Sequence, residues 1–212
     1  MSAPVLFGAS YSVYVRSARL ALEEKGVPYR LEDVDIFAKG GPPAGYLQRH
    51  PFGRIPAFEH DGFRLYETGA ITRYVDEAFA GPKLQPANPQ PRARMNQVLS
   101  ILDNYAYRTL VWDIFVERVR APAQGRTADE AKIAAALPKA ETCLAAIESL
   151  MEGDHLAGDA LTLADLHAAP MFAYVTLAAE GAALLRRHAG LASWWQRMTQ
   201  RPSVAAVCQP PA

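Results

Sequence analysis

The sequence predicts a chain in two parts, an α/β first domain followed by an all-α second domain. Over residues 1–80, short apolar runs of strand length alternate with helical stripes. The segment GPKLQPANPQP then brings together four prolines, which do not fit a helix interior or a central strand. Beyond it only helical periodicity remains. We therefore expect domains at residues 1–80 and 91–212, joined by a linker at 81–90.

Length, composition and charge bound the possible functions. The chain has 212 residues, enough to bury one or two real cores. Lysine plus arginine equals aspartate plus glutamate, at 22 each, so the formal net charge is zero. No basic excess points to nucleic acid and no acidic tail points to a disordered arm. A neutral enzyme that acts on a small molecule fits this balance better.

Cysteine usage and the absence of targeting signals predict a cytoplasmic protein. Cys143 and Cys208 are too few for a disulfide scaffold and lack metal-ligand spacing, so we interpret them as buried, inert thiols in a reducing cytosol. The N-terminal residues MSAPVLFGAS do not resemble a signal peptide. No apolar run reaches the roughly 18 residues of a membrane span, so no membrane association is expected.

The first domain begins with a strand, a helix and a second strand. An apolar run before Gly8 predicts a buried strand, and a helical stripe follows from Ser12 until the basic last turn and glycine stop at Lys25-Gly26. The expected elements are a strand at Val5–Phe7, a helix from Ser12, a strand at Tyr29–Ile36 and a short helical turn at Tyr46–His50.

A hairpin and a helix complete this domain. Residues 57–60 and 63–66 flank Asp61-Gly62, the strongest short hairpin signal in the sequence. An amphipathic stripe from Ile71 to Phe79 predicts the next helix. The order is then β-α-β-(α)-β-β-α. A parallel pair joined by a helix, followed by an antiparallel hairpin and a helix, is the order of a thioredoxin-like domain.

The second domain is expected to be a helical bundle. Helical stripes cover residues 95–109, 137–151, 162–176 and 193–200. Pro138 lies near the start of the second stripe, and the pattern leaves open whether a helix begins or is kinked there. Thr162 and Asp165 have the spacing of a short-chain capping box, so we interpret Asp165 as a structural cap.

The start of the first helix is suited to an anion. A helix N-terminus presents unpaired N–H groups and the positive end of the macrodipole. The Ser12 hydroxyl there can donate a hydrogen bond to a thiolate, although a plain N-cap is the alternative. Lowering a thiol pKa from about 8.5 by two units requires about 2.7 kcal/mol of preference for the anion. A charged-acceptor hydrogen bond and a helix end can supply it.

Two further features precede and follow the hairpin. Ile55-Pro56 is compatible with a cis proline whose neighbouring backbone could pair with an extended peptide, although an ordinary strand-starting proline is the alternative. Thr68 at a helix start suits a carboxylate, and Glu67 suits an ammonium. A simple helix cap with an early acidic residue explains that pair equally well.

Together these features lead to a family. The phrases LFGASYSVYVRSARLALEEKGVPY, HPFGRIPAFEHDGFRLYETGAITRYV and LTLADLHAAP resemble cytosolic glutathione transferases, especially the serine-type phi and theta-like classes and their bacterial relatives. The resemblance implies that Ser12 contacts the glutathione sulfur and activates it. It also implies a set of glutathione-binding residues: Lys39, Arg54, Ile55, Pro56, Glu67, Thr68 and, through the partner subunit, Asp103.

The sequence departs from the family pattern in three places. Gly41 and Pro42 stand where the phi class has a basic pair for the glycyl carboxylate, and Lys39 is a candidate substitute. Ser10 stands where proline is common, so Ser10 and Tyr11 compete with Ser12 for the sulfur. No cysteine occupies position 11 or 12, which argues against disulfide-type chemistry.

The resemblance implies conjugation of glutathione to a small apolar electrophile by a homodimer, with glutathione as co-substrate and no metal or other cofactor. The second substrate is expected between the domains, with Tyr11, Tyr105, Arg108 and Trp112 as candidate walls. Core or interface aromatics and a solvated arginine are the alternatives for the last three. A glutathione-dependent isomerase or dehalogenase, or a non-catalytic binding protein of this fold, also remains open.

Overall fold

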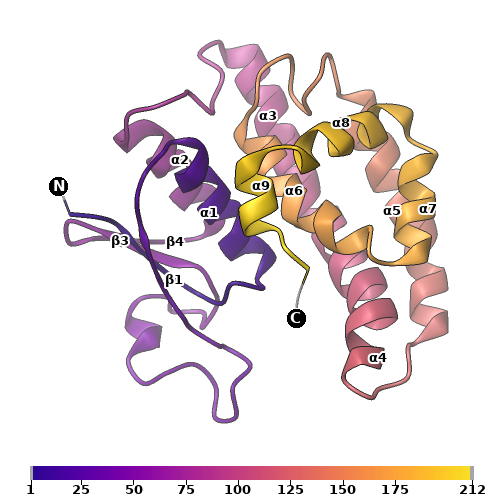
Figure 1. The fold of residues 1–212 in the computed structure, drawn as a ribbon, viewed down its shortest axis with the longest axis horizontal. Helices are drawn as coiled ribbons and strands as arrows, with labels where there is room; N and C mark the ends of the chain where they lie inside the picture. Colours follow the sequence, from indigo (N-terminus) through magenta and orange to yellow (C-terminus); the bar gives the residue numbers. More distant parts are fainter. Residues whose placement is uncertain (1, 211–212) are drawn as a thin grey trace. The chain divides into compact units, whose positions relative to one another are not determined.

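The computed structural model describes residues 2–210, which divide into two compact units. The first unit ends at Leu84 and the second begins at Gln85. The first is a four-stranded sheet with helices, and the second is helical (Figure 1). The predicted fold class, a thioredoxin-like domain followed by a helical domain, is confirmed.

The sheet of the first unit has the strand order β2-β1-β3-β4. Strand β1 pairs in parallel with β2 and antiparallel with β3, and β3 pairs antiparallel with β4. Asp61 and Gly62 both have positive φ, at 46° and 82°, as a tight hairpin turn requires. The elements are β1 (Val5–Phe7), α1 (Val13–Glu24), β2 (Arg30–Glu32), η1 (Tyr46–Gln48), β3 (Ala57–His60), β4 (Phe63–Tyr66) and α2 (Thr68–Ala78).

Strand β2 is shorter than the sequence predicts. We expected a strand over residues 29–36, but only Arg30–Glu32 pairs with β1, which itself has three residues. Since a strand can extend only as far as its neighbour offers hydrogen-bonding groups, the rest of the segment leaves the sheet. Residues 33–45 form the irregular connection that contains Lys39.

A buried ion pair closes the first unit. Lys25 Nζ lies 3.2 Å from Asp76 Oδ1 and donates to the carbonyl oxygens of Asp76 and Pro82 at 3.0 and 2.9 Å. The same Asp76 oxygen accepts the N–H of Leu84 at 2.8 Å. These contacts tie the end of α1 to α2 and to the chain that follows it.

The second unit is built from helices and no strand is found in its described residues. Long helices run nearly without interruption from Pro89 to Ala123, and shorter helices follow the central α5 and α6. The elements are α3 (Pro89–Ile101), η2 (Leu102–Arg120), α4 (Ala121–Ala123), α5 (Glu130–Ser149), α6 (Leu163–Val175), α7 (Ala179–Arg186), α8 (Ala189–Thr199) and α9 (Pro202–Val207).

The structure corrects or completes three predictions in the helical part. Helix α3 begins at Pro89, inside the segment assigned to the linker, because proline is tolerated in the first helical turn. Helix α5 begins at Glu130, so Pro138 lies inside it. Residues 102–120 form a wide π-helix, which the periodicity had not distinguished from an α-helix.

Helix α6 starts at the predicted capping box. Thr162 is its N-cap, and both reciprocal hydrogen bonds of the box are present. Asp165 is fully buried and also accepts hydrogen bonds from the Leu156 N–H at 2.9 Å and the Trp194 indole N–H at 2.8 Å. The cap therefore joins α6 to the preceding loop and to α8.

Candidate functional site

The first helix starts at Ser12, as predicted. Ser12 is the N-cap of α1, with an extended backbone at φ −69° and ψ 128°. Its Oγ accepts the Val15 N–H at 3.5 Å, the long limit of a hydrogen bond. A hydroxyl has one donor and two acceptor sites, so this contact leaves its hydrogen available to a ligand. Ser12 is half-buried, which leaves it accessible.

The turn before Ser12 separates the three hydroxyl candidates. The Tyr11 hydroxyl donates to Asp35 Oδ1 at 3.0 Å, which engages its one proton. Ser10 is exposed, and its carbonyl oxygen accepts a hydrogen bond from Arg16 Nε at 2.9 Å. Of the three, Ser12 is the one that lies at the N-terminal end of the helix, where anions are favoured.

Gly8, which has no side chain, allows the Ile55 segment to lie close to this turn. A Cβ at Gly8 would lie 2.4 Å from Val15 Cγ2 and 3.2 Å from the Ile55 Cβ. Only a glycine at the end of β1 therefore lets α1 and Ile55 pack this closely. The close approach places Ile55 and the first turn of α1 on either side of Gly8.

The Ile55–Pro56 peptide bond is cis, as the resemblance implies. Among residues 2–210, no main-chain hydrogen bond involves the N–H or C=O of Ile55. The preceding carbonyl, of Arg54, accepts a hydrogen bond from the Tyr46 hydroxyl at 2.8 Å. Burial raises the pKa of Tyr46 to about 12, so the phenol remains a donor. The Ile55 main chain is thus available to an extended peptide.

Glu67 and Thr68 lie at the start of α2. Glu67 is exposed and has φ 69° and ψ 118°, a left-handed conformation uncommon for a residue other than glycine. Such conformations cluster at functional sites. Thr68 is the first residue of the helix and is 6 % exposed. Its N–H belongs to the first helical turn, where donors lack intrahelical partners, so the pair can receive a carboxylate and an ammonium.

Lys39 and Arg54 are exposed cations of the first unit. Neither forms an ion pair with another residue in the described part of the chain. Lys39 lies in the irregular connection after β2, and Arg54 directly precedes Ile55. Both can therefore approach a ligand carboxylate, while Gly41 and Pro42 offer no charge.

His50 and Tyr46 are residues that sequence reasoning did not assign to the site. His50 is 2 % exposed, and its Nδ1 has no hydrogen-bond partner within residues 2–210. Its ring lies 4.9 Å from the Tyr66 ring. Burial lowers the pKa of His50, while the nearby charge of Glu67 raises it and that of Arg54 lowers it. The sequence signal that could have found His50 was its position: it directly precedes Pro51, in the same segment as Ile55-Pro56.

Asp103 lies on η2 and has a partner within the same chain. Its Oδ1 lies 2.7 Å from His167 Nε2, on α6. His167 is buried, whereas the side chain of Asp103 remains 45 % exposed. The carboxylate is thus oriented by the helical domain itself, which the sequence did not indicate.

The three proposed pocket residues Tyr105, Arg108 and Trp112 all lie on η2. In a π-helix the hydrogen bonds run from i to i+5, so positions three and four apart no longer align as in an α-helix. Their α-helical spacing therefore does not decide whether they share one face, and their place in a pocket stays a prediction. Tyr105 is 64 % exposed and Trp112 is half-buried.

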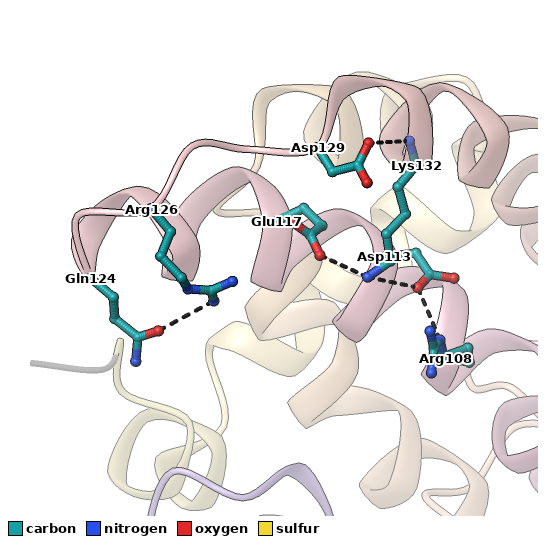
Figure 2. Close-up of polar contacts among 7 residues, drawn as sticks. All are labelled: Arg108, Asp113, Glu117, Gln124, Arg126, Asp129 and Lys132. Atoms are coloured by element: carbon teal, nitrogen blue, oxygen red, sulfur yellow. Dashed lines mark hydrogen bonds and ion pairs between the residues drawn. The ribbon is translucent and has the colours of Figure 1, made fainter.

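Arg108 belongs to a chain of ion pairs between η2 and α5. Figure 2 shows its guanidinium beside Asp113, with Nε 2.9 Å from Oδ1. The same Asp113 oxygen lies 3.6 Å from Lys132 Nζ, which also bonds Glu117 Oε1 at 2.7 Å. These contacts support the alternative interpretation of Arg108 as a solvated surface charge.

Two features of the described residues bear on other functions. No group of three or more His, Cys, Asp or Glu side chains within residues 2–210 is arranged to hold a metal ion. No helix in that range is long and apolar enough to cross a membrane.

Comparison with known proteins assigns both domains to one family. Residues 6–83 match the family model for the glutathione S-transferase N-terminal domain, and residues 92–202 match the model for the C-terminal domain. Glutathione S-transferase 4 of Zea mays is 31% identical, over 96% of this chain and 91% of that protein.

Solved structures agree over the whole length. Glutathione S-transferase I from mais in complex with an atrazine glutathione conjugate has a TM-score of 0.85 at 28% identity, covering 100% of both chains. The theta class glutathione S-transferase of Xanthomonas axonopodis pv. citri with glutathione bound has a TM-score of 0.84 at 26% identity, covering 100% of this chain and 99% of that one. With both domain models matched and the fold shared end to end, this chain belongs to the glutathione S-transferase family.

Proposed function

We propose that this protein is a serine-type, phi- and theta-like glutathione transferase of bacterial kind, which conjugates the glutathione thiolate to small apolar electrophiles. The observation that carries the proposal is the Ser12 hydroxyl at the N-terminus of α1, next to the cis Ile55–Pro56 segment. The solved relatives, one with an atrazine glutathione conjugate and one a theta class enzyme with glutathione, support the substrate class.

The reaction requires a sulfur anion at neutral pH. Glutathione binds as the thiol, whose proton passes to solvent, and the Ser12 hydroxyl donates a hydrogen bond to the resulting thiolate. The sulfur electron pair then forms a bond to the electrophilic carbon. In a substitution the leaving group departs with the electrons of its bond. In an addition to an activated double bond the π electrons move to the far atom, which takes a proton from solvent. The protein supplies anion stabilisation and orientation rather than a covalent intermediate.

The remaining contacts hold the tripeptide at both ends and in the middle. The Ile55 main chain pairs with the cysteinyl unit, and Pro56 fixes the direction of that segment. The Thr68 N–H and hydroxyl receive the γ-glutamyl carboxylate, and Glu67 receives the ammonium. Arg54 and Lys39, both exposed, receive the glycyl carboxylate in place of the basic pair absent at positions 41 and 42.

The enzyme acts as a homodimer in this proposal. Phe52 and Tyr66 are 69 % and 39 % exposed, and their ring centroids lie 6.2 Å apart, so they form an apolar patch of the kind found in interfaces. Asp103 would then reach the γ-glutamyl amine in the other subunit. Sedimentation equilibrium tests the assembly: Phe52→Ser should weaken the dimer, and a wild-type monomer would contradict the proposal.

The cytosol is the expected compartment. Cys143 and Cys208 are not joined in a disulfide, and burial raises the pKa of Cys143, which makes it unreactive. Reduced cysteines suit a reducing environment.

The test combines binding, turnover and titration. The wild type should be retained on immobilised glutathione and should conjugate a chlorinated nitrobenzene, with a bound thiol pKa below that of free glutathione. Ser12→Ala should raise that pKa and slow conjugation by about 10- to 100-fold, the worth of one hydrogen bond to a charged group. Ser10→Ala is the matched control, two residues away on the exposed side of the turn.

The outcomes separate the competing interpretations. Full activity in Ser12→Ala with loss in Ser10→Ala would show that the sulfur contact is assigned to the wrong serine. Retention without turnover would favour an isomerase, a dehalogenase or a binding protein. A folded protein that is not retained at all would contradict the enzyme proposal.

A further inference from the structure

Arg16 is a buried cation that the proposed mechanism does not use. It lies on α1, one turn after Ser12, and is 4 % exposed, although arginine is seldom fully buried. Its Nε donates to the carbonyl oxygen of Ser10 at 2.9 Å. The guanidinium therefore contacts the turn that carries the candidate catalytic hydroxyl.

Helix geometry explains how Arg16 reaches this turn. The Arg16 N–H donates to the Ser12 carbonyl at 2.9 Å, so Arg16 lies one helical turn after the N-cap residue. Helical side chains lean toward the N-terminus, so the arginine extends back past Ser12 to Ser10. A lysine could supply the charge at this position, but only a planar guanidinium offers several donors in a fixed direction.

The turn is held at three points. The Ser12 N–H closes it by donating to the Ala9 carbonyl at 3.0 Å, and the Tyr11 hydroxyl anchors its outer side to Asp35. Arg16 holds the Ser10 carbonyl from inside. Because the Ser12 hydroxyl makes only the long contact to Val15 within residues 2–210, its orientation depends on these neighbouring contacts.

We propose that Arg16 is a positioning residue for thiolate formation: it holds the Ser10–Ser12 turn so that the Ser12 hydroxyl faces the glutathione sulfur, and adds a fixed positive charge at the start of α1. This inference rests on the proposed function and deepens it. The charge of Arg16 and the N-terminal dipole of α1 have the same sign, so both favour an anion at the turn. Neither contributes to the contacts of Thr68 or Glu67 with the other end of the tripeptide.

The test compares Arg16→Met with Arg19→Met. Arg19 lies on the same helix, is half-buried and bonds the Tyr29 hydroxyl at 2.9 Å, so its substitution removes the same charge without touching the turn. The thiol pKa of bound glutathione is read by ultraviolet titration, together with kcat, the KM for glutathione and the unfolding midpoint. Arg16→Met should raise that pKa by about one unit and lower kcat about tenfold below neutral pH, since one unit is a tenfold change in thiolate. The KM for glutathione should change little, and Arg19→Met should keep the wild-type thiol pKa and kcat.

A second variant separates positioning from folding. Arg16→Lys keeps the buried charge and fills a similar volume, so it should fold and recover part of the thiol pKa shift. If both Arg16 variants keep the wild-type thiol pKa and lose only stability, the inference is overturned while the proposed function stands. If the wild type itself shows no lowered thiol pKa, the proposed function fails first.

Discussion

Replacing Asp165 with alanine should be among the most destabilising single substitutions in this protein. The carboxylate is fully buried and accepts four hydrogen bonds. Its Oδ1 receives the Leu156 N–H at 2.9 Å and the Trp194 indole N–H at 2.8 Å. Its Oδ2 receives the Thr162 N–H at 2.8 Å and the Thr162 hydroxyl at 2.9 Å. Alanine removes the acceptor shared by the cap of α6, the preceding loop and α8.

The magnitude follows from the donors left behind. The N–H groups of Leu156, Thr162 and Trp194 are buried and would lose their acceptor, and each unsatisfied donor costs about 1–3 kcal/mol. Their sum is about 3–9 kcal/mol, and relief of the buried charge and entry of water offset part of it. We expect a loss of about 4 kcal/mol, a large share of the 5–15 kcal/mol typical of a folded protein.

Two matched variants test the reasoning. Asp165→Asn keeps an oxygen for Leu156 and Trp194 but turns an amide donor toward the Thr162 N–H, so it should cost less than alanine. Thr162→Ala removes the hydroxyl that bonds Asp165 and the Ala164 N–H, and should cost about 1 kcal/mol as a lost N-cap.

The assay is urea unfolding followed by far-ultraviolet circular dichroism at one fixed protein concentration, because a dimer's stability depends on concentration. The expected order of destabilisation is alanine, then asparagine, then Thr162→Ala, with similar slopes. If Asp165→Ala unfolds within about 1 kcal/mol of the wild type at an unchanged slope, the burial argument is wrong.

Three other predictions follow from contacts in the first unit. Lys25→Met should destabilise by about 3–5 kcal/mol in urea unfolding, because it leaves the Asp76 carboxylate buried without its cation; a double variant with Asp76→Asn should be less destabilised, and equal losses would contradict this. Tyr11→Phe should keep the conjugation rate within about threefold, because its hydroxyl is engaged by Asp35 rather than the sulfur; a loss as large as that of Ser12→Ala would reassign the sulfur contact. Since burial lowers the pKa of His50, the unfolded chain binds this proton more readily, and stability falls as the pH drops below about 6.5. His50→Asn should therefore reduce the loss of urea midpoint between about pH 8 and about pH 5.5, and an unchanged loss would show that His50 does not contribute.

The local signals of the first domain were sufficient to predict its elements. Asp61-Gly62, the glycine stop at Gly26 and the serine at position 12 each specify backbone geometry through their own chemistry, and the structure places a turn, a helix end and an N-cap there. The length of β2 was not predictable in this way. It depends on how many residues of β1 are available to pair, which is a property of two segments rather than one.

The candidate site likewise contains features that the sequence indicated and features that it did not. The sequence alone indicated Ser12, Ile55-Pro56 and Glu67-Thr68, because each residue type suits its place in a turn or at a helix start. It did not indicate that the Tyr11 hydroxyl is engaged by Asp35 or that Arg16 reaches back to Ser10. Those contacts depend on side-chain direction in the folded chain.

The helical domain shows the physical reason most clearly. The spacing of Thr162 and Asp165 by itself determined the start of α6, since a capping box involves only neighbours within one turn. Only the tertiary structure decided that Trp194, on a different helix, donates to the same carboxylate, that His167 pairs with Asp103, and that residues 102–120 form a π-helix. Local patterns are set by the geometry of a few adjacent residues, whereas these features arise from packing between segments far apart in the chain.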